Sequence, residues 1–222
     1  MASADKGNFF RLAVASFAGA GINYGSDTIK LSLVRMSSIG TAAKAITGAT
    51  NATPIVITAT AHGYANGDWV QIIGVGGNTN ANGVFKVANQ AANTFELTDP
   101  ITGANIAGSG AYTSGGYVIN MDTVQFHSSV SGGIVATSSA LSSKTSTLGV
   151  LDAADVTFTA VGSGAACDAL LLWKDTTVSG TSPLILLIGS LELIWSAHES
   201  SVWADESDPL QHKTMRDRKS VV

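Results

Sequence analysis

The sequence predicts a mainly β protein, with an antiparallel β-sandwich or barrel core, one short N-terminal helix, an inserted small β-barrel-like domain and an extended C-terminal arm. Three observations support this prediction. Apolar residues fall in short runs that are separated by clusters of Gly, Asn, Ser and Thr. Charge nearly disappears between residues 48 and 116, and charged residues gather after residue 198. These composition changes mark the expected domain limits.

The N-terminal part of the chain predicts one helix followed by one strand. Asn8 can cap a helix, and Gly19 and Gly21 can end it. The apolar residues at near-helical spacing between them are Phe9, Phe10, Leu12, Ala13, Phe17 and Ala18. Residues 27–34 (DTIKLSLV) then alternate strictly between apolar and polar side chains, so we expect a half-buried strand there.

Residues 48–116 predict a small β domain inserted into the first domain. Four short apolar runs, PIVIT, WVQII, VFKV and TFEL, begin at residues 54, 69, 84 and 94. Gly and Asn clusters such as GVGGNTNANG separate them, as in hairpin turns. Short strands at a spacing of roughly ten residues are typical of a small antiparallel barrel or sandwich. The charged residues of this stretch are Asp68, Lys86, Glu96 and Asp99.

The outer domain resumes after the insertion, so we expect it to consist of residues 1–47 and 117–198. A polar stretch covers residues 128–146, and the alternating run 156–161 (VTFTAV) predicts an exposed strand. Continuously apolar runs predict buried strands. They cover residues 169–173 and 184–188, and a further strand is expected at the apolar run 191–195 (LELIW). Residues 199–222 are polar and are expected to form an arm outside the core.

Charge and hydropathy exclude two classes of partner. Twelve Lys and Arg against 16 Asp and Glu give a net charge of −4, so the chain has no overall basic field for a nucleic-acid backbone. The longest apolar run, residues 183–197, is shorter than the roughly 20 residues that a membrane helix needs, and it contains Glu192. We therefore expect neither a nucleic-acid partner nor a membrane.

Residues that could perform chemistry are scattered. No two histidines lie three to five residues apart, as a shared metal would require; they are His62, His127, His198 and His212. Cys167 is the single cysteine and is expected to be a small buried core residue. No Gly-x-Ser-x-Gly motif is present. The sequence thus predicts no catalytic residues, no metal site and no cofactor, and the chain is not expected to be an enzyme.

Aromatic and basic residues indicate binding surfaces. Trp173 and Trp195 lie in apolar runs and are expected in the core, whereas Trp203 lies in the arm and is predicted to anchor it in a neighbouring molecule. Tyr64 and Trp69 could present a face to a sugar. The basic residues expected to contact a partner through the arm are Lys213, Arg216, Arg218 and Lys219.

Two segments of the outer domain resemble a family of small virion structural proteins of tailed bacteriophages. They are residues 9–34, FFRLAVASFAGAGINYGSDTIKLSLV, and residues 154–188, ADVTFTAVGSGAACDALLLWKDTTVSGTSPLILLI, with the turn Ser114-Gly115-Gly116 between them. The inserted segments HGYANGDWVQIIGVGG, NGVFKV and TFELTD are similar to small β modules embedded in many phage virion proteins. The resemblance covers about half of the chain, and the C-terminal arm has no counterpart in it.

The resemblance implies a structural role on the virion surface. We expect a capsid decoration or cement protein, made in the host bacterial cytoplasm, that contacts the major capsid protein and other copies of itself. Two alternatives remain open at this stage. The first is a structural protein of the neck or tail, and the second is a virion module that binds a host-surface glycan.

Overall fold

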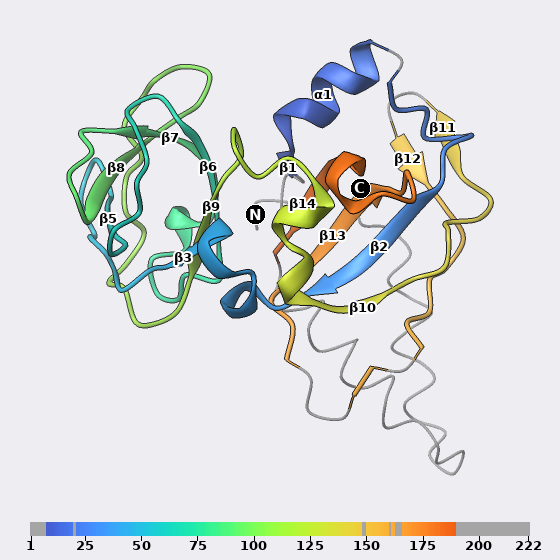
Figure 1. Cartoon of the computed structure of the whole chain (residues 1–222). Coiled ribbons are helices and arrows are strands. Elements are labelled where there is room, and N and C mark those ends of the chain that lie inside the picture. The colour runs from blue at the N-terminus through green and yellow to red at the C-terminus, as the bar shows by residue number, and fades with distance from the viewer. Residues whose placement is uncertain (1–7, 20, 148–149, 160, 163–165, 190–222) are drawn as a thin grey trace, which may run out of the picture.

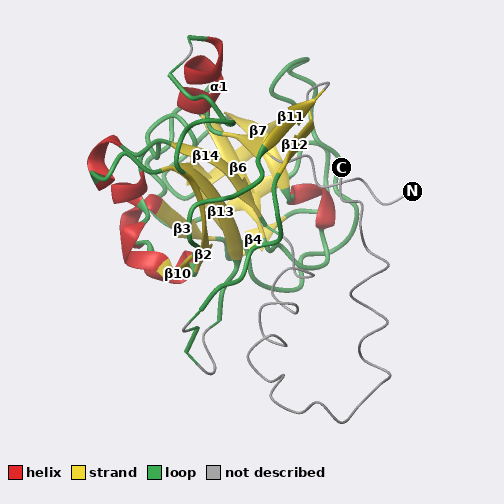
Figure 2. Cartoon of the chain, turned by 90° about the vertical axis from the view of Figure 1, so that its right-hand side faces the viewer, coloured by secondary structure: helices red, strands yellow, loops and turns green. Residues whose placement is uncertain are grey.

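The computed structural model describes residues 8–19, 21–147, 150–159, 161–162 and 166–189. Within these residues the protein is mainly β, with antiparallel sheets and one short α-helix. The predicted fold class is therefore confirmed. Figure 1 shows a closed group of strands on one side of the molecule and a second sheet on the other, and Figure 2 shows the helical turns lying around the strands. The predicted strand 191–195 and the arm 199–222 lie outside the described residues.

The outer domain is built on a five-stranded antiparallel sheet. Its strands lie in the order β1 (Asn8–Phe9), β14 (Leu184–Ile188), β13 (Ala169–Lys174), β2 (Ile29–Val34) and β10 (Ile134–Thr137). The two continuously apolar runs thus become the adjacent strands β13 and β14. We call the buried cluster on this sheet the sheet core. Its members include Phe10, Ala13, Ile29, Val34, Leu171, Trp173, Leu184 and Leu187.

The predicted N-terminal helix is α1 (Arg11–Ala18), and it packs against β14. The predicted cap at Asn8 is wrong. Asn8 pairs with Leu187 as part of β1, so its backbone belongs to the sheet, and the helix begins after Phe10 without a side-chain cap. Because Asn8 pairs with β14, the residue at the N-cap position of the helix is Phe10. The helix ends at Gly19, as expected, and the Gly19 amide donates to the carbonyl of Ala15 at 2.8 Å.

The strand predicted over residues 27–34 is β2, but it is more deeply buried than strict alternation implies. Ser32 lies on the expected polar face and is 0% exposed. The Trp173 indole donates to the Ser32 hydroxyl at 2.9 Å, and Thr137 contacts the same hydroxyl at 2.9 Å. A serine is tolerated there because both neighbouring strands supply hydrogen-bond partners.

Seven strands between residues 43 and 120 close into a small structure that we call the barrel. The sheet order begins at β3 (Ala43–Ala45) and ends at β4 (Gly48–Ala49), and these two strands are separated in sequence by Ile46 and Thr47 alone. The Ile46 amide donates to the carbonyl of Gly116, beside β9 (Tyr117–Asn120), and the Thr47 amide donates to the carbonyl of Thr58 in β5 (Val56–Thr58). One bent stretch of chain thus completes both edges of the sheet. The order is β3 (Ala43–Ala45), β9 (Tyr117–Asn120), β6 (Trp69–Ile73), β7 (Gly83–Ala88), β8 (Thr94–Thr98), β5 (Val56–Thr58) and β4 (Gly48–Ala49).

The interior of the barrel is filled by the apolar runs that the sequence singled out. All four predicted runs contain a strand. The barrel strands extend from residue 43 to residue 120, whereas the predicted insertion covers residues 48–116. The buried residues, which we call the barrel core, include Ile57, Val70, Ile72, Phe85, Val87, Phe95, Leu97 and Val118.

Asparagine side chains hold the long connection between β6 and β7. The Asn82 amide accepts from the Val75 N–H at 2.8 Å and donates to the Val75 carbonyl at 2.9 Å, so it substitutes for a backbone pair. Asn78 is fully buried, donates to Thr50 and accepts from the Ser109 amide. The Gly/Asn cluster of the sequence is thus a turn region in which polar side chains satisfy backbone hydrogen-bonding groups.

The second half of the chain departs from prediction in two places. The polar stretch 128–146 contains the edge strand β10, which pairs with β2. Residues 156–159 of the predicted exposed strand are not in a strand within the described part of the chain. A separate hairpin, β11 (Thr145–Thr147) with β12 (Val150–Asp152), precedes them instead.

The barrel and the five-stranded sheet share one interface. Ile73 and Ile119 of the barrel belong to the same buried cluster as the sheet core. Gln71 is 3% exposed, and its side-chain amide donates to the Leu187 carbonyl of β14 at 2.8 Å. The junction therefore combines apolar packing with a buried side-chain-to-backbone hydrogen bond. No helix within the described residues is long and apolar enough to cross a membrane.

Candidate functional site

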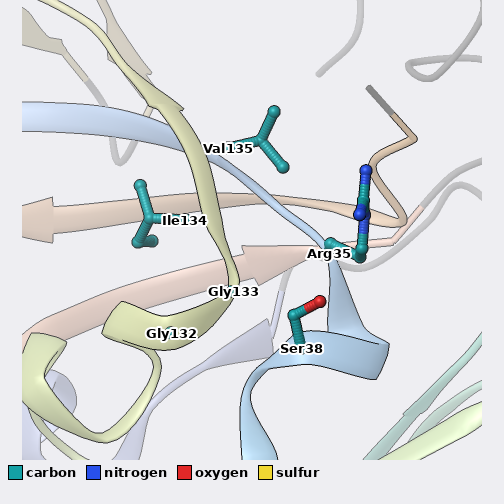
Figure 3. Close-up of a pocket in the computed structure, with 6 residues that line it drawn as sticks. All are labelled: Arg35, Ser38, Gly132, Gly133, Ile134 and Val135. Atoms are coloured by element: carbon teal, nitrogen blue, oxygen red, sulfur yellow. The ribbon is translucent and has the colours of Figure 1, made fainter. Parts of the chain in front are cut away.

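A hollow beside the edge strand β10 contains an arginine. Its cavity volume is about 240 Å³, and Arg35 and Ser38 face the backbone of residues 132–135 across it (Figure 3). Arg35 follows β2, and its Nε donates to the Ala166 carbonyl at 3.0 Å. The lining residues are Arg35, Ser38, Gly132, Gly133, Ile134 and Val135.

Close backbone packing shapes this hollow. A side chain at Gly133 would overlap Ile39 and would lie 2.6 Å from the Arg35 carbonyl oxygen, so glycine is required there. Arg35 is the one ionisable residue among the six that line the hollow. A guanidinium can hold a carboxylate or phosphate group, but general acid–base chemistry needs a group that titrates near neutral pH. The volume is also below the roughly 300–1,000 Å³ of small-molecule sites.

Polar residues that are distant in sequence meet around Trp173. The ring centroids of His127 and Trp173 are 4.1 Å apart, and His127 Nδ1 lies 3.0 Å from the Ser179 hydroxyl. Lys30 Nζ lies 5.9 Å from the centroid of the Trp173 ring and 2.7 Å from Asp175. We call these five residues the Trp173 cluster. Sequence analysis missed it because long-range strand pairing, which no local pattern reports, brings its members together.

The electrostatics of this cluster favour a neutral histidine. Burial lowers the pKa of His127, Lys30 lowers it further, and Asp175 opposes both effects. Within the described residues, Nε2 is buried without a hydrogen-bond partner. A second ring proton would therefore create a positive charge on a ring whose buried Nε2 has no acceptor. The hydrogen bond from Lys30 holds the pKa of Asp175 below its usual range. The geometry favours a structural contact over proton transfer to a substrate.

A pH titration tests this electrostatic assignment. Because the pKa of His127 is lower in the folded state than the roughly 6.5 of an unfolded histidine, the unfolded state binds more protons between the two values. The free energy of unfolding should therefore fall as the pH drops below about 6.5. His127→Phe should remove this dependence. Equilibrium unfolding at several pH values measures the difference, and a His127 NMR midpoint at or above 6.5 would contradict the assignment.

The two predicted sugar-facing aromatics do not form an exposed face. Tyr64 is 8% exposed, and its hydroxyl donates to the Val118 carbonyl at 3.1 Å. Burial raises the pKa of this hydroxyl. Trp69 is half-buried against the sheet core, and Lys86 Nζ lies 5.4 Å from its ring centroid. The prediction for Tyr64 is wrong because its ring is buried in the barrel wall.

The remaining predicted residues divide between the core and the undescribed part of the chain. Cys167 is buried as expected, and burial raises the pKa of its thiol. Trp173 is a core residue, also as expected. Among the described residues, no group of three or more His, Cys, Asp or Glu side chains could hold a metal ion. The predictions that lie outside the described residues are those for Trp195, Trp203, Lys213, Arg216, Arg218 and Lys219.

Comparison with known proteins adds no further assignment. No protein-family model matches this chain, and no curated protein matches it.

Proposed function

We propose that this chain is a structural protein of a tailed-bacteriophage virion, and specifically a decoration protein on the major capsid lattice. The resemblance of residues 9–34 and 154–188 to small virion proteins is the observation that carries this proposal. A structural role is also consistent with several polar side chains of the described residues, which make hydrogen bonds that hold the fold together. Asn78 and Asn82 hold loops, Ser32 and Trp173 join strands, and Gln71 joins the barrel to the sheet.

A decoration protein acts mechanically. The shared core makes the barrel and the sheet suitable as one stiff body that bridges neighbouring capsomers. Interfaces of about 1,200–2,000 Å² per contact, repeated over a lattice, would resist internal pressure. In this proposal residues 199–222 clasp a neighbour, with Trp203 as the apolar anchor. Lys213, Arg216, Arg218 and Lys219 supply positive charge for acidic groups of the partner.

The number of copies in purified virions tests the location. Mass spectrometry against the major capsid protein should give hundreds of copies per particle if the chain decorates the capsid lattice. A count of six, twelve or a few dozen would overturn the decoration assignment and place the chain in the neck or tail. Absence from purified virions would overturn the virion assignment itself.

A substitution in the arm tests the clasp. Trp203→Ala should weaken incorporation into particles by about 2 kcal/mol or more per contact if the ring is buried in a partner. Competition between wild-type and variant protein for undecorated particles measures this difference. Val178→Ala is the matched control because Val178 is an exposed apolar residue of the described domain. Equal incorporation of all three proteins would contradict the clasp.

A further inference from the structure

Residues 156–159 combine a strand-forming sequence with a backbone that no other described residue pairs with. The sequence Val-Thr-Phe-Thr alternates β-branched and aromatic residues, which favour strands. In the structure these residues are not in a strand, and their backbone makes no hydrogen bond to another described residue. Local preference and observed pairing therefore disagree here.

The side chains of this segment already alternate as in a sheet. Val156 and Phe158 are half-buried, and Val156 packs against the sheet core. Thr157 and Thr159 are exposed. One face thus packs on the body of the protein, while the backbone groups are not paired with any other described residue. An uncharged alternating segment whose N–H and C=O groups are unpaired within the described part of the chain is a template for pairing with another chain.

We propose that residues 155–159 pair with the same residues of a second copy of this chain, as antiparallel strands about a two-fold axis. A two-fold axis perpendicular to the two-stranded sheet leaves the body-facing side chains of both copies on one side of that sheet. Body-facing residues must therefore lie opposite body-facing residues, and exposed residues opposite exposed residues. The register that centres on Thr157 meets this condition. It places Thr157 opposite the partner's Thr157, Val156 opposite the partner's Phe158, and Asp155 opposite the partner's Thr159.

The second copy is favoured as the occupant because this register is self-complementary. Thr–Thr and aromatic–β-branched pairs are both favourable across antiparallel strands, and the aromatic pair occurs twice by symmetry. The one charge in the segment, Asp155, faces a threonine, so no like charges oppose each other. A strongly charged partner would find no complementary charge on residues 156–159.

The pairing involves few residues, which sets its expected strength. Five-residue strands bury far less than the roughly 1,200–2,000 Å² of a stable interface, so the contact should be weak for two free molecules. It would become effective where other contacts hold copies side by side. The inference concerns the purified chain and does not depend on the virion assignment.

Cysteine cross-linking of the full-length chain tests the register. Thr157→Cys, in a Cys167→Ala background, should form an intermolecular disulfide under mild oxidation. Opposed Cα atoms of antiparallel strands lie about 4.5–5.5 Å apart, within disulfide range. Thr159→Cys is the matched control, since Thr159 is also exposed and lies on the same face as Thr157. The two copies of Thr159 would be about 14 Å apart in this register, beyond disulfide reach.

The expected result is a disulfide dimer that forms several-fold faster for Thr157→Cys than for Thr159→Cys. Adding Phe158→Ala to Thr157→Cys should slow the reaction, because the aromatic pair is lost while the thiol stays exposed. Equal rates for the two cysteines would indicate random collision and overturn the register. A folded Thr157→Cys protein that stays monomeric, as judged by circular dichroism and gel electrophoresis, would overturn the pairing.

Discussion

Replacing Phe95 by alanine is expected to lower the free energy of unfolding by about 3–5 kcal/mol. Phe95 is fully buried in β8. Its ring meets Tyr64 edge-on, with centroids 5.7 Å apart, and meets His62 edge-on at 5.1 Å. Truncation removes the transfer free energy of the ring and leaves a cavity in a closed barrel whose strands cannot easily collapse inward.

Urea denaturation followed by tryptophan fluorescence and circular dichroism measures this loss. Ile101→Ala is the control, because Ile101 is 88% exposed and should change the free energy of unfolding by less than about 0.5 kcal/mol. Separate transitions for the barrel and the sheet would show that the shared junction does not couple them. A loss below about 1 kcal/mol for Phe95→Ala would contradict a filled barrel.

Gly77→Ala is expected to cost about 2–5 kcal/mol of stability, from backbone strain and overlap together. Gly77 has a φ of +79°, a conformation that disfavours side chains. An added Cβ would also overlap the carbonyl oxygen of Ala111, which belongs to the facing loop. The Cβ position is fixed by the backbone of residue 77, and the oxygen belongs to the backbone of residue 111. Relief of the overlap would therefore require the β6–β7 connection or the facing loop to move.

Gly103→Ala separates the two contributions to this cost. Gly103 has a similar φ of +72°, but no atom lies within 4 Å of the position a Cβ would take. The expected loss is therefore the backbone strain alone, about 1–2 kcal/mol. Thermal or urea unfolding of both variants gives the comparison. Equal losses at the two positions would mean that the loop containing Ala111 yields without cost.

Local patterns predicted the strands that carry their own apolar run. The runs beginning at residues 69, 84 and 94 each became a barrel strand, because alternation and Gly/Asn turns are encoded within a few residues. The same reasoning failed for residues 156–159 and missed β10 (Ile134–Thr137). An extended segment becomes a strand only if a neighbouring strand pairs with its backbone, and that neighbouring strand lies elsewhere in the chain.

The candidate functional residues also divide into those that local sequence predicted correctly and those that only the tertiary structure places. Cys167 and Trp173 were assigned to the core from their apolar neighbours in sequence, and both are buried. Tyr64 was predicted as an aromatic residue that could face a sugar, but its ring is buried in the barrel wall. The contact between His127 and Trp173 joins residues 46 positions apart through the pairing of distant strands, so no spacing in the sequence reveals it.

The sequence by itself determined the fold class, the positions of the main apolar strands and the low-charge character of the inserted domain. These properties depend on side-chain periodicity and composition, which are local. The tertiary structure decided that Ile46 and Thr47 close the barrel, that Asn8 joins a sheet and that Ser32 is buried. Each of these outcomes depends on which distant backbone group satisfies a hydrogen bond, and that choice exists only once the chain is folded.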